Sequence, residues 1–142
     1  MERNKHRTTF FSANRMLNPD DKEFVGVTAI LTLTNIKCKD TTEGRKIVTA
    51  RAAVNNHSKM MSKMLGVDVP EQDGTTWVDV VFWDDKAERF TRFLKGRDKV
   101  RVCVVGSMKP RAWKHEDGTE NLGVTITCFN WDGIPTHQLL NK

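Results

Sequence analysis

The fold is decided by residues 76–96, which read TWVDVVFWDDKAERFTRFLKG. The first part, residues 76–83, is apolar and β-branched, and this composition predicts a strand. Asp84 or Asp85 can then cap a helix that runs to Leu94, because an Asp side chain accepts the unpaired N–H groups of a first helical turn. Gly96 stands where a helix usually ends. The stretch therefore predicts a strand followed directly by a short amphipathic helix.

Further strands are predicted on both sides of this unit. Alternating apolar residues predict strands over residues 24–39, 46–55, 99–108 and 121–131. Turns are expected at 18–21, 40–44 and 116–118, and a helical turn at 58–65. The order of three strands, a helix and two strands is that of an all-β OB-fold, a five-stranded Greek-key barrel with a helix between strands 3 and 4.

The length of 142 residues suits one domain, which we place at residues 24–132. Residues 1–23 are expected to form a basic N-terminal arm, and residues 133–142 a short C-terminal tail. No apolar run approaches a membrane span, and the start lacks the apolar centre of a signal peptide. Cys38, Cys103 and Cys128 form no CxxC pair, which favours reduced thiols and a cytoplasmic location.

Catalysis finds little support in the sequence. The four histidines are scattered, no serine stands in a nucleophile–base arrangement, and no glycine-rich phosphate loop is present. The neighbouring carboxylates Asp84 and Asp85 are better explained as helix caps than as an acid–base pair. We therefore expect a protein that is not an enzyme and that uses no cofactor and no metal.

Tryptophans and cations give the strongest functional pattern. Trp77 and Trp83 are six residues apart on one predicted strand, so both indoles lie on the same face, with Asp79 between them. The other face of this strand is the better candidate for the core. Trp113 lies in a polar, basic segment expected to be a loop, whereas Trp131 is expected to be structural.

The chain carries 23 Lys and Arg against 18 Asp and Glu, a formal net charge of +5. Such an excess favours a polyanionic partner, although many soluble proteins are equally basic. Indole faces can stack on bases while cations contact phosphates, the combination typical of a single-stranded nucleic-acid groove. The predicted binding residues are Trp77, Trp83, Trp113, Arg51, Arg101, Lys109, Arg111 and Lys114.

Residues 76–102 resemble the central block of bacterial-type single-stranded DNA-binding proteins. In that family a Trp opens strand 3, an aromatic closes it, and "Ala-Glu…Leu-Lys-Gly" forms the helix and its end. A "Val-x-Val-x-Gly" strand and a "Trp…Asp-Gly" hairpin follow, met here by residues 102–106 and 113–118. Upstream, residues 48–55 are similar to the second strand, so the resemblance spans roughly residues 25–132. It implies an OB-fold that oligomerises, commonly as a tetramer, and binds single-stranded DNA without sequence preference, with Trp77, Trp83 and Trp113 stacking on bases.

Three departures from the family pattern stand out. Asp79 replaces a residue that is usually basic or neutral. The family's further aromatic after strand 2 falls on Asn55-Asn-His-Ser58, where His57 takes its place. The chain ends without the acidic, hydrophobic tip of cellular members, which suggests a divergent copy from a phage, plasmid or other mobile element.

We therefore expect protection of single-stranded DNA in replication, recombination or repair, by a homo-dimer or homo-tetramer. Two alternatives remain from the sequence. One is an OB-fold interaction module that pairs with a replication or recombination protein. The other is binding of single-stranded RNA, since the preference depends on contacts to the 2′-hydroxyl that a sequence does not show.

Overall fold

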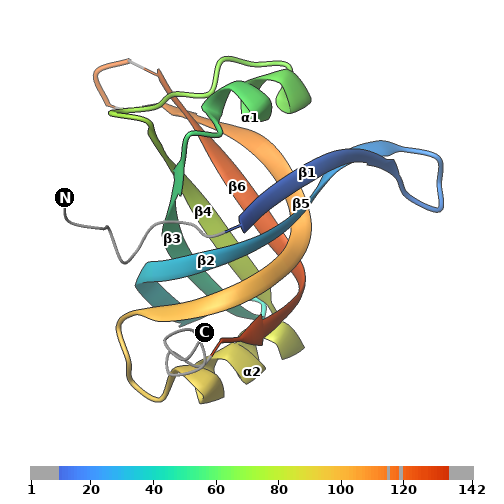
Figure 1. Ribbon diagram of the computed structural model, residues 1–142. Coiled ribbons are helices and arrows are strands. Elements are labelled where there is room, and N and C mark those ends of the chain that lie inside the picture. Colours follow the sequence, from blue (N-terminus) through green and yellow to red (C-terminus); the bar gives the residue numbers. More distant parts are fainter. Residues whose placement is uncertain (1–9, 115, 119, 135–142) are drawn as a thin grey trace, which may run out of the picture.

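The computed structural model describes residues 10–114, 116–118 and 120–134. Its strands form a barrel (Figure 1). The elements are β1 (Phe10–Leu17), β2 (Glu23–Asp40), β3 (Lys46–Asn55), α1 (Ser58–Leu65), β4 (Thr75–Trp83), α2 (Asp85–Leu94), β5 (Val100–Lys114) and β6 (Glu120–Gly133). Among the described residues, no helix combines the length and the apolarity needed to cross a membrane.

The sheet closes on itself because β2 pairs with β5 as well as with β3. The strand order is β1-β2-β3-β4-β6-β5, and β5 also pairs with β2. The residues of β2 from Val25 to Leu33 pair with β5, and those from Thr34 to Asp40 pair with β3. The β4–β6 pair is parallel and all other pairs are antiparallel. With α2 between β4 and β5, this is the predicted OB-fold.

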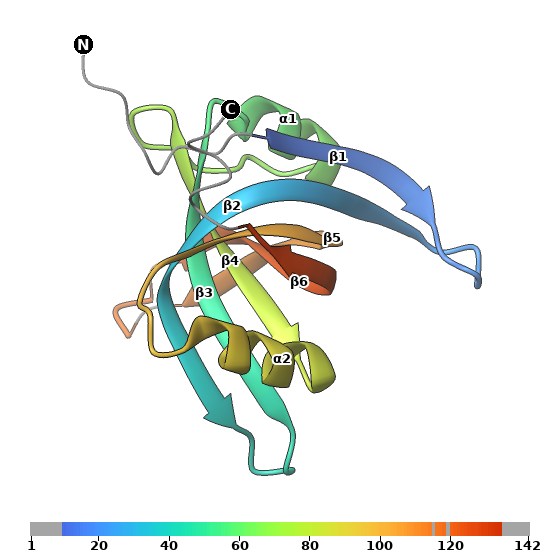
Figure 2. The same cartoon turned by 60° about the horizontal axis from the view of Figure 1, so that its bottom comes forward.

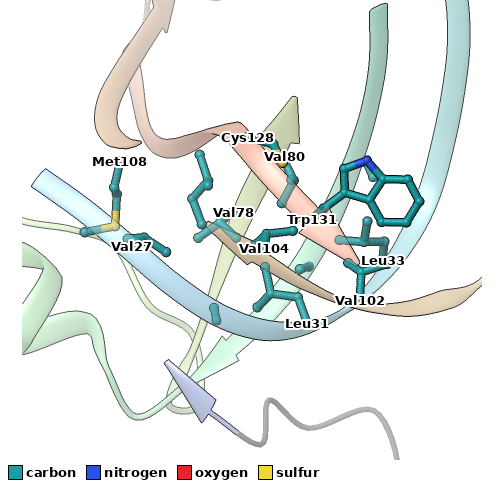
Figure 3. Packing of buried hydrophobic residues seen from close by; sticks show 14 of the residues in the cluster. Val27, Leu31, Leu33, Val78, Val80, Val102, Val104, Met108, Cys128 and Trp131 are labelled. Carbon is teal, nitrogen blue, oxygen red and sulfur yellow. The ribbon is translucent and has the colours of Figure 1, made fainter. Parts of the chain in front are cut away.

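The core fills the inside of the barrel with inward-facing strand residues (Figure 3). Val78, Val80 and Phe82 of β4 are fully buried, as the alternation predicts. Trp131 of β6 is 6% exposed, and its ring packs edge-on against those of Phe82 and Phe90. The prediction that Trp131 is structural is therefore confirmed.

The predicted N-terminal arm differs from expectation where the structure describes it. Residues 10–17 form β1, which pairs with β2 from Glu23 to Ile30. Phe11 and Ala13 point inward and join the core. This strand forms because β2 extends beyond β3 and leaves an edge whose backbone groups need partners. The β1–β2 hairpin projects from the barrel, as Figures 1 and 2 show. The rest of the arm, residues 1–9, lies outside the described residues, as does most of the tail.

Two local expectations were wrong. The segment from Lys109 to Lys114 is not a loop, because β5 and β6 continue as a hairpin to the turn at residues 116–118. Asp84 precedes α2, but among the described residues its carboxylate makes no capping hydrogen bond. That carboxylate instead accepts hydrogen bonds from Arg45.

Candidate nucleic-acid interface

The outer face of β3 and β4 carries two of the predicted tryptophans. Trp77 is 49% exposed and Trp83 is half-buried, and both point away from the core. They stand at opposite ends of β4, separated by roughly 20 Å at the rise of a strand. The prediction that the two indoles share the face opposite Val78, Val80 and Phe82 is confirmed.

Each of these indoles has an arginine over its ring. The Cζ atom of Arg51 is 5.2 Å from the ring centroid of Trp77, and that of Arg45 is 4.4 Å from the centroid of Trp83. Trp77 pairs across the strands with Ala53, and Trp83 with Ile47. In both cases the arginine lies two residues before that partner. The six-residue spacing of the tryptophans is thus matched by a six-residue spacing of the arginines.

Each arginine is also paired with a carboxylate. Arg51 Nε is 3.7 Å from Asp79 Oδ1, directly across the strands. Arg45 donates from Nη2 to Asp84 Oδ2 at 2.7 Å and from Nε to Oδ1 at 3.2 Å. The hydrogen bond from Arg45 holds the pKa of Asp84 below its ordinary value. Asp79, noted in the sequence as a departure, is therefore the partner of Arg51 on this face.

Further cations flank the tryptophans on both sides. On β2, exposed Lys37 and Lys39 pair with Thr49 and Ile47 and continue the same outer face beside Trp83. On β5, exposed Lys109 and Arg111 lie at the other end. The register runs Arg51, Asp79, Thr125, Lys109 across β3, β4, β6 and β5. The face that carries the indoles is therefore bordered by two basic strand segments.

Arg101 and His57 lie elsewhere. Arg101 is on β5 and donates to Thr32 Oγ1 at 3.1 Å, with β2 between it and β3. Partial burial lowers the pKa of its guanidinium. The ring of His57 packs against Phe11, with centroids 5.4 Å apart, and its Nδ1 is 2.6 Å from the carbonyl oxygen of Asn55. The structure places Arg101 across β2 from β3, on the outer surface of β2 and β5, and His57 beyond the end of β3.

Trp113 and Lys114 are positioned through their backbones only. They lie at the end of β5, paired with Asn121 and Glu120. Their side chains lie outside the described part of the chain, so their roles in binding stay predictions. Both positions extend the basic strand segment that begins at Lys109.

Sequence reasoning missed Arg45, Lys37 and Lys39. The signal for Arg45 was available, because Arg45 and Arg51 repeat the spacing of Trp77 and Trp83. The signal for the lysines was that Lys37 and Lys39 flank Cys38 in a strand already predicted, so both point to the same face of that strand. What the sequence could not supply was the register that sets these residues beside β4.

The arrangement suits a chain of linked bases and phosphates. Indole faces accept planar apolar partners, and the surrounding guanidinium and ammonium groups donate to anionic oxygens.

Comparisons with known proteins identify the family and support the fold. The sequence profile of the Single-strand binding protein family matches residues 27–131. A search of curated protein sequences found no match. The crystal structure of the small single-stranded DNA-binding protein from Streptomyces coelicolor is similar, with a TM-score of 0.56 and 17% identity. The similarity covers 80% of this chain and 97% of that one.

A second similar structure is that of a deletion mutant (delta 228-252 R190A) of the single-stranded DNA binding protein from Thermus aquaticus. Its TM-score is 0.52 at 13% identity, over 84% of this chain and 45% of that one. At such identities the two structures support the fold, and the matching profile over most of the chain supplies the family. The resemblance found in the sequence is confirmed: the chain belongs to the single-strand binding protein family.

Proposed function

We propose that this protein binds single-stranded DNA without sequence preference on the outer face of β3 and β4. The observation that carries the proposal is the pair of outward indoles, Trp77 and Trp83, on a face bordered by basic strand segments in a member of this family. Each base stacked on an indole should contribute about 1–3 kcal/mol, with little dependence on which base it is.

Phosphate contacts supply the second part of the affinity. Lys37, Lys39, Lys109 and Arg111 are exposed beside the tryptophans, where a strand lying across β4 would place its backbone. Neutralising phosphates releases condensed counterions, so binding should weaken with salt at about 0.7 logarithmic units per contact and per decade of salt.

The biological role follows from such binding. A protein that covers bases in this way protects exposed strands during replication, recombination or repair. All three cysteines, which lie in the described part of the chain, are free thiols, and this fits a reducing cytoplasmic setting. Family membership agrees with the prediction that the protein is not an enzyme.

Titration with oligo-dT tests the proposal. Stacking should quench tryptophan fluorescence at low salt, and affinity should fall steeply as salt rises. Competition with poly-U in the same assay measures any preference for DNA over RNA. Absence of quenching and of binding at low salt would contradict the proposal. Stable capture of a replication protein, without oligonucleotide binding, would then favour an interaction module.

We further propose that the chain forms a homo-dimer or homo-tetramer through a separate apolar surface. Exposed Met16, Val105 and Phe129 lie on β1, β5 and β6, and the rings of Phe24 and Phe129 are 6.2 Å apart. Monomeric proteins seldom leave such clusters open to water. None of these residues lies on β3 or β4, but β6 pairs with β4, so this surface borders the strands that carry Trp77 and Trp83.

Light scattering tests the assembly. The wild-type protein should have at least twice the mass of the chain, and Phe129→Ser should shift it toward the monomer. Trp77→Ala serves as the control, because it removes a similarly exposed aromatic from β4, outside this apolar surface, and should leave the mass unchanged. A monomeric wild-type protein at high concentration would contradict this proposal.

A further inference from the structure

The outer face of β3 and β4 contains the same three-residue unit twice. Each unit has a tryptophan, an arginine over the indole and a carboxylate on that arginine. The units are Trp77, Arg51 and Asp79, and Trp83, Arg45 and Asp84. All of these carboxylate and guanidinium groups are at least about one-third exposed, which leaves them open to an incoming ligand.

In the second unit the carboxylate of Asp84 is hydrogen-bonded to Arg45. Asp84 stands at the start of α2 with φ 55° and ψ −120°, outside the extended backbone range in which a side chain caps the first-turn N–H groups. It instead accepts two hydrogen bonds from Arg45, whose own pKa is raised by this contact. Backbone hydrogen bonds fix both segments: Thr41 N donates to Arg45 O within the turn between β2 and β3, and Asp84 N donates to Lys46 O at the end of β4. The β2–β3 hairpin therefore positions the backbone of Arg45, and Asp84 holds its guanidinium over the ring of Trp83.

A guanidinium in this position occupies an indole face that a base would need. A base can stack there only after the arginine moves aside. Carboxylate and phosphate both present paired anionic oxygens to the planar fork of an arginine. The phosphate next to a stacked base is thus the natural new partner for the displaced guanidinium.

We propose that Arg45 and Arg51 are phosphate ligands of single-stranded DNA, and that Asp84 and Asp79 act as internal competitors that hold them on the tryptophans until a strand binds. The proposal rests on the DNA-binding function proposed above. In the free protein each arginine is neutralised by its carboxylate. In the complex each arginine donates to a phosphate and each indole receives a base. The carboxylates lower affinity, and they keep the indoles covered when no strand is present.

Removing the carboxylate charge should therefore strengthen binding. Asp84→Asn and Asp79→Asn should each tighten binding to oligo-dT by about 1.4- to fivefold, the range expected for an exposed ion pair. In the wild-type protein, the carboxylate that loses its arginine on DNA binding takes up a cation from solution, which offsets part of the counterion release. The Asn variants lack this uptake, so the salt dependence should steepen by at most about 0.7 per variant. Asn suits position 84, where φ is 55°, since Asn adopts positive φ more readily than most residues.

Asp85→Asn is the matched control. Asp85 is the neighbouring exposed carboxylate and carries the same charge, but it belongs to neither unit. Its substitution reports the general electrostatic effect of one lost negative charge. The inference requires Asp84→Asn to exceed this control clearly.

A double-mutant cycle decides whether the arginine carries the gain. Arg45→Ala should weaken binding, and Asp84→Asn should give no additional tightening in the Arg45→Ala background. A gain that survives without Arg45, or one no larger than that of Asp85→Asn, would overturn the inference while leaving DNA binding intact. If the wild-type protein and the Asp79→Asn/Asp84→Asn variant both fail to bind oligo-dT, the proposed function fails and the inference fails with it. Binding by that variant alone would support the inference.

Discussion

Replacing Trp77 by alanine should weaken DNA binding while the barrel stays folded. Trp77 stands at one end of β4 with 49% of its surface exposed, and its ring packs under Arg51 on the outer face. No core contact depends on the exposed half of the indole. The substitution therefore removes a stacking surface and leaves the barrel interior, on the opposite side of β4, unchanged.

The effects on the free energy of unfolding and on the free energy of DNA binding are measured separately. A fully buried tryptophan covers about 150–250 Å². The half-exposed Trp77 should therefore contribute about 2–3 kcal/mol to the free energy of unfolding. Loss of one stacked base costs about 1–3 kcal/mol of binding free energy, which is about a 5- to 150-fold higher Kd. Trp77→Phe retains a ring and should recover most of the affinity.

The assay is fluorescence anisotropy with labelled oligo-dT, run beside urea unfolding of each variant. We expect Trp77→Ala to raise Kd within this range, with the same salt slope as the wild-type protein, because no phosphate contact is lost. An unchanged Kd for a folded Trp77→Ala variant would refute the stacking role. A loss of affinity that Trp77→Phe does not restore would assign the effect to altered backbone structure.

Four further predictions concern the phosphate contacts, the core and Cys128. Lys109→Gln should lower the salt slope by about 0.7 while leaving fluorescence quenching in place, as measured by titration at several salt concentrations. Trp131→Ala should lower the free energy of unfolding by about 3–5 kcal/mol in urea, because its ring fills the core. Burial raises the pKa of the Cys128 thiol to about 12, so Cys128 should resist iodoacetamide at pH 8 while exposed Cys38 reacts, as mass spectrometry would show. The neutral Cys128 thiol favours the folded state, so its contribution to stability should be present below pH 9 and disappear as the pH rises toward 12.

Much of the barrel could be predicted because its strands have one face inside and one face in water. The predicted ranges 46–55 and 58–65 coincide with β3 and α1. The alternation along β4 placed Trp77 and Trp83 on the outer face without any knowledge of neighbouring strands. Local periodicity was sufficient wherever burial differed between the two faces of a strand.

The missed features depend on contacts between segments far apart in the sequence. β1 forms against the free edge of β2, and the extension of β5 to Lys114 forms against β6, where a polar segment shows no periodicity. The local capping rule failed at Asp84 because its backbone is at φ 55° and ψ −120°, and its carboxylate accepts two charge-assisted hydrogen bonds from Arg45 of the β2–β3 hairpin. The pairing of each indole with an arginine likewise appears only once the β3–β4 register is known.

The central claim is that single-stranded DNA lies across the outer face of β3 and β4. Ultraviolet cross-linking of the wild-type protein to oligo-dT, followed by peptide mapping, tests it most directly. We predict that the cross-linked peptides contain Trp77 or Trp83. Cross-links confined to β1 or to the segment around Phe129, with residues 75–83 unmodified, would contradict the account.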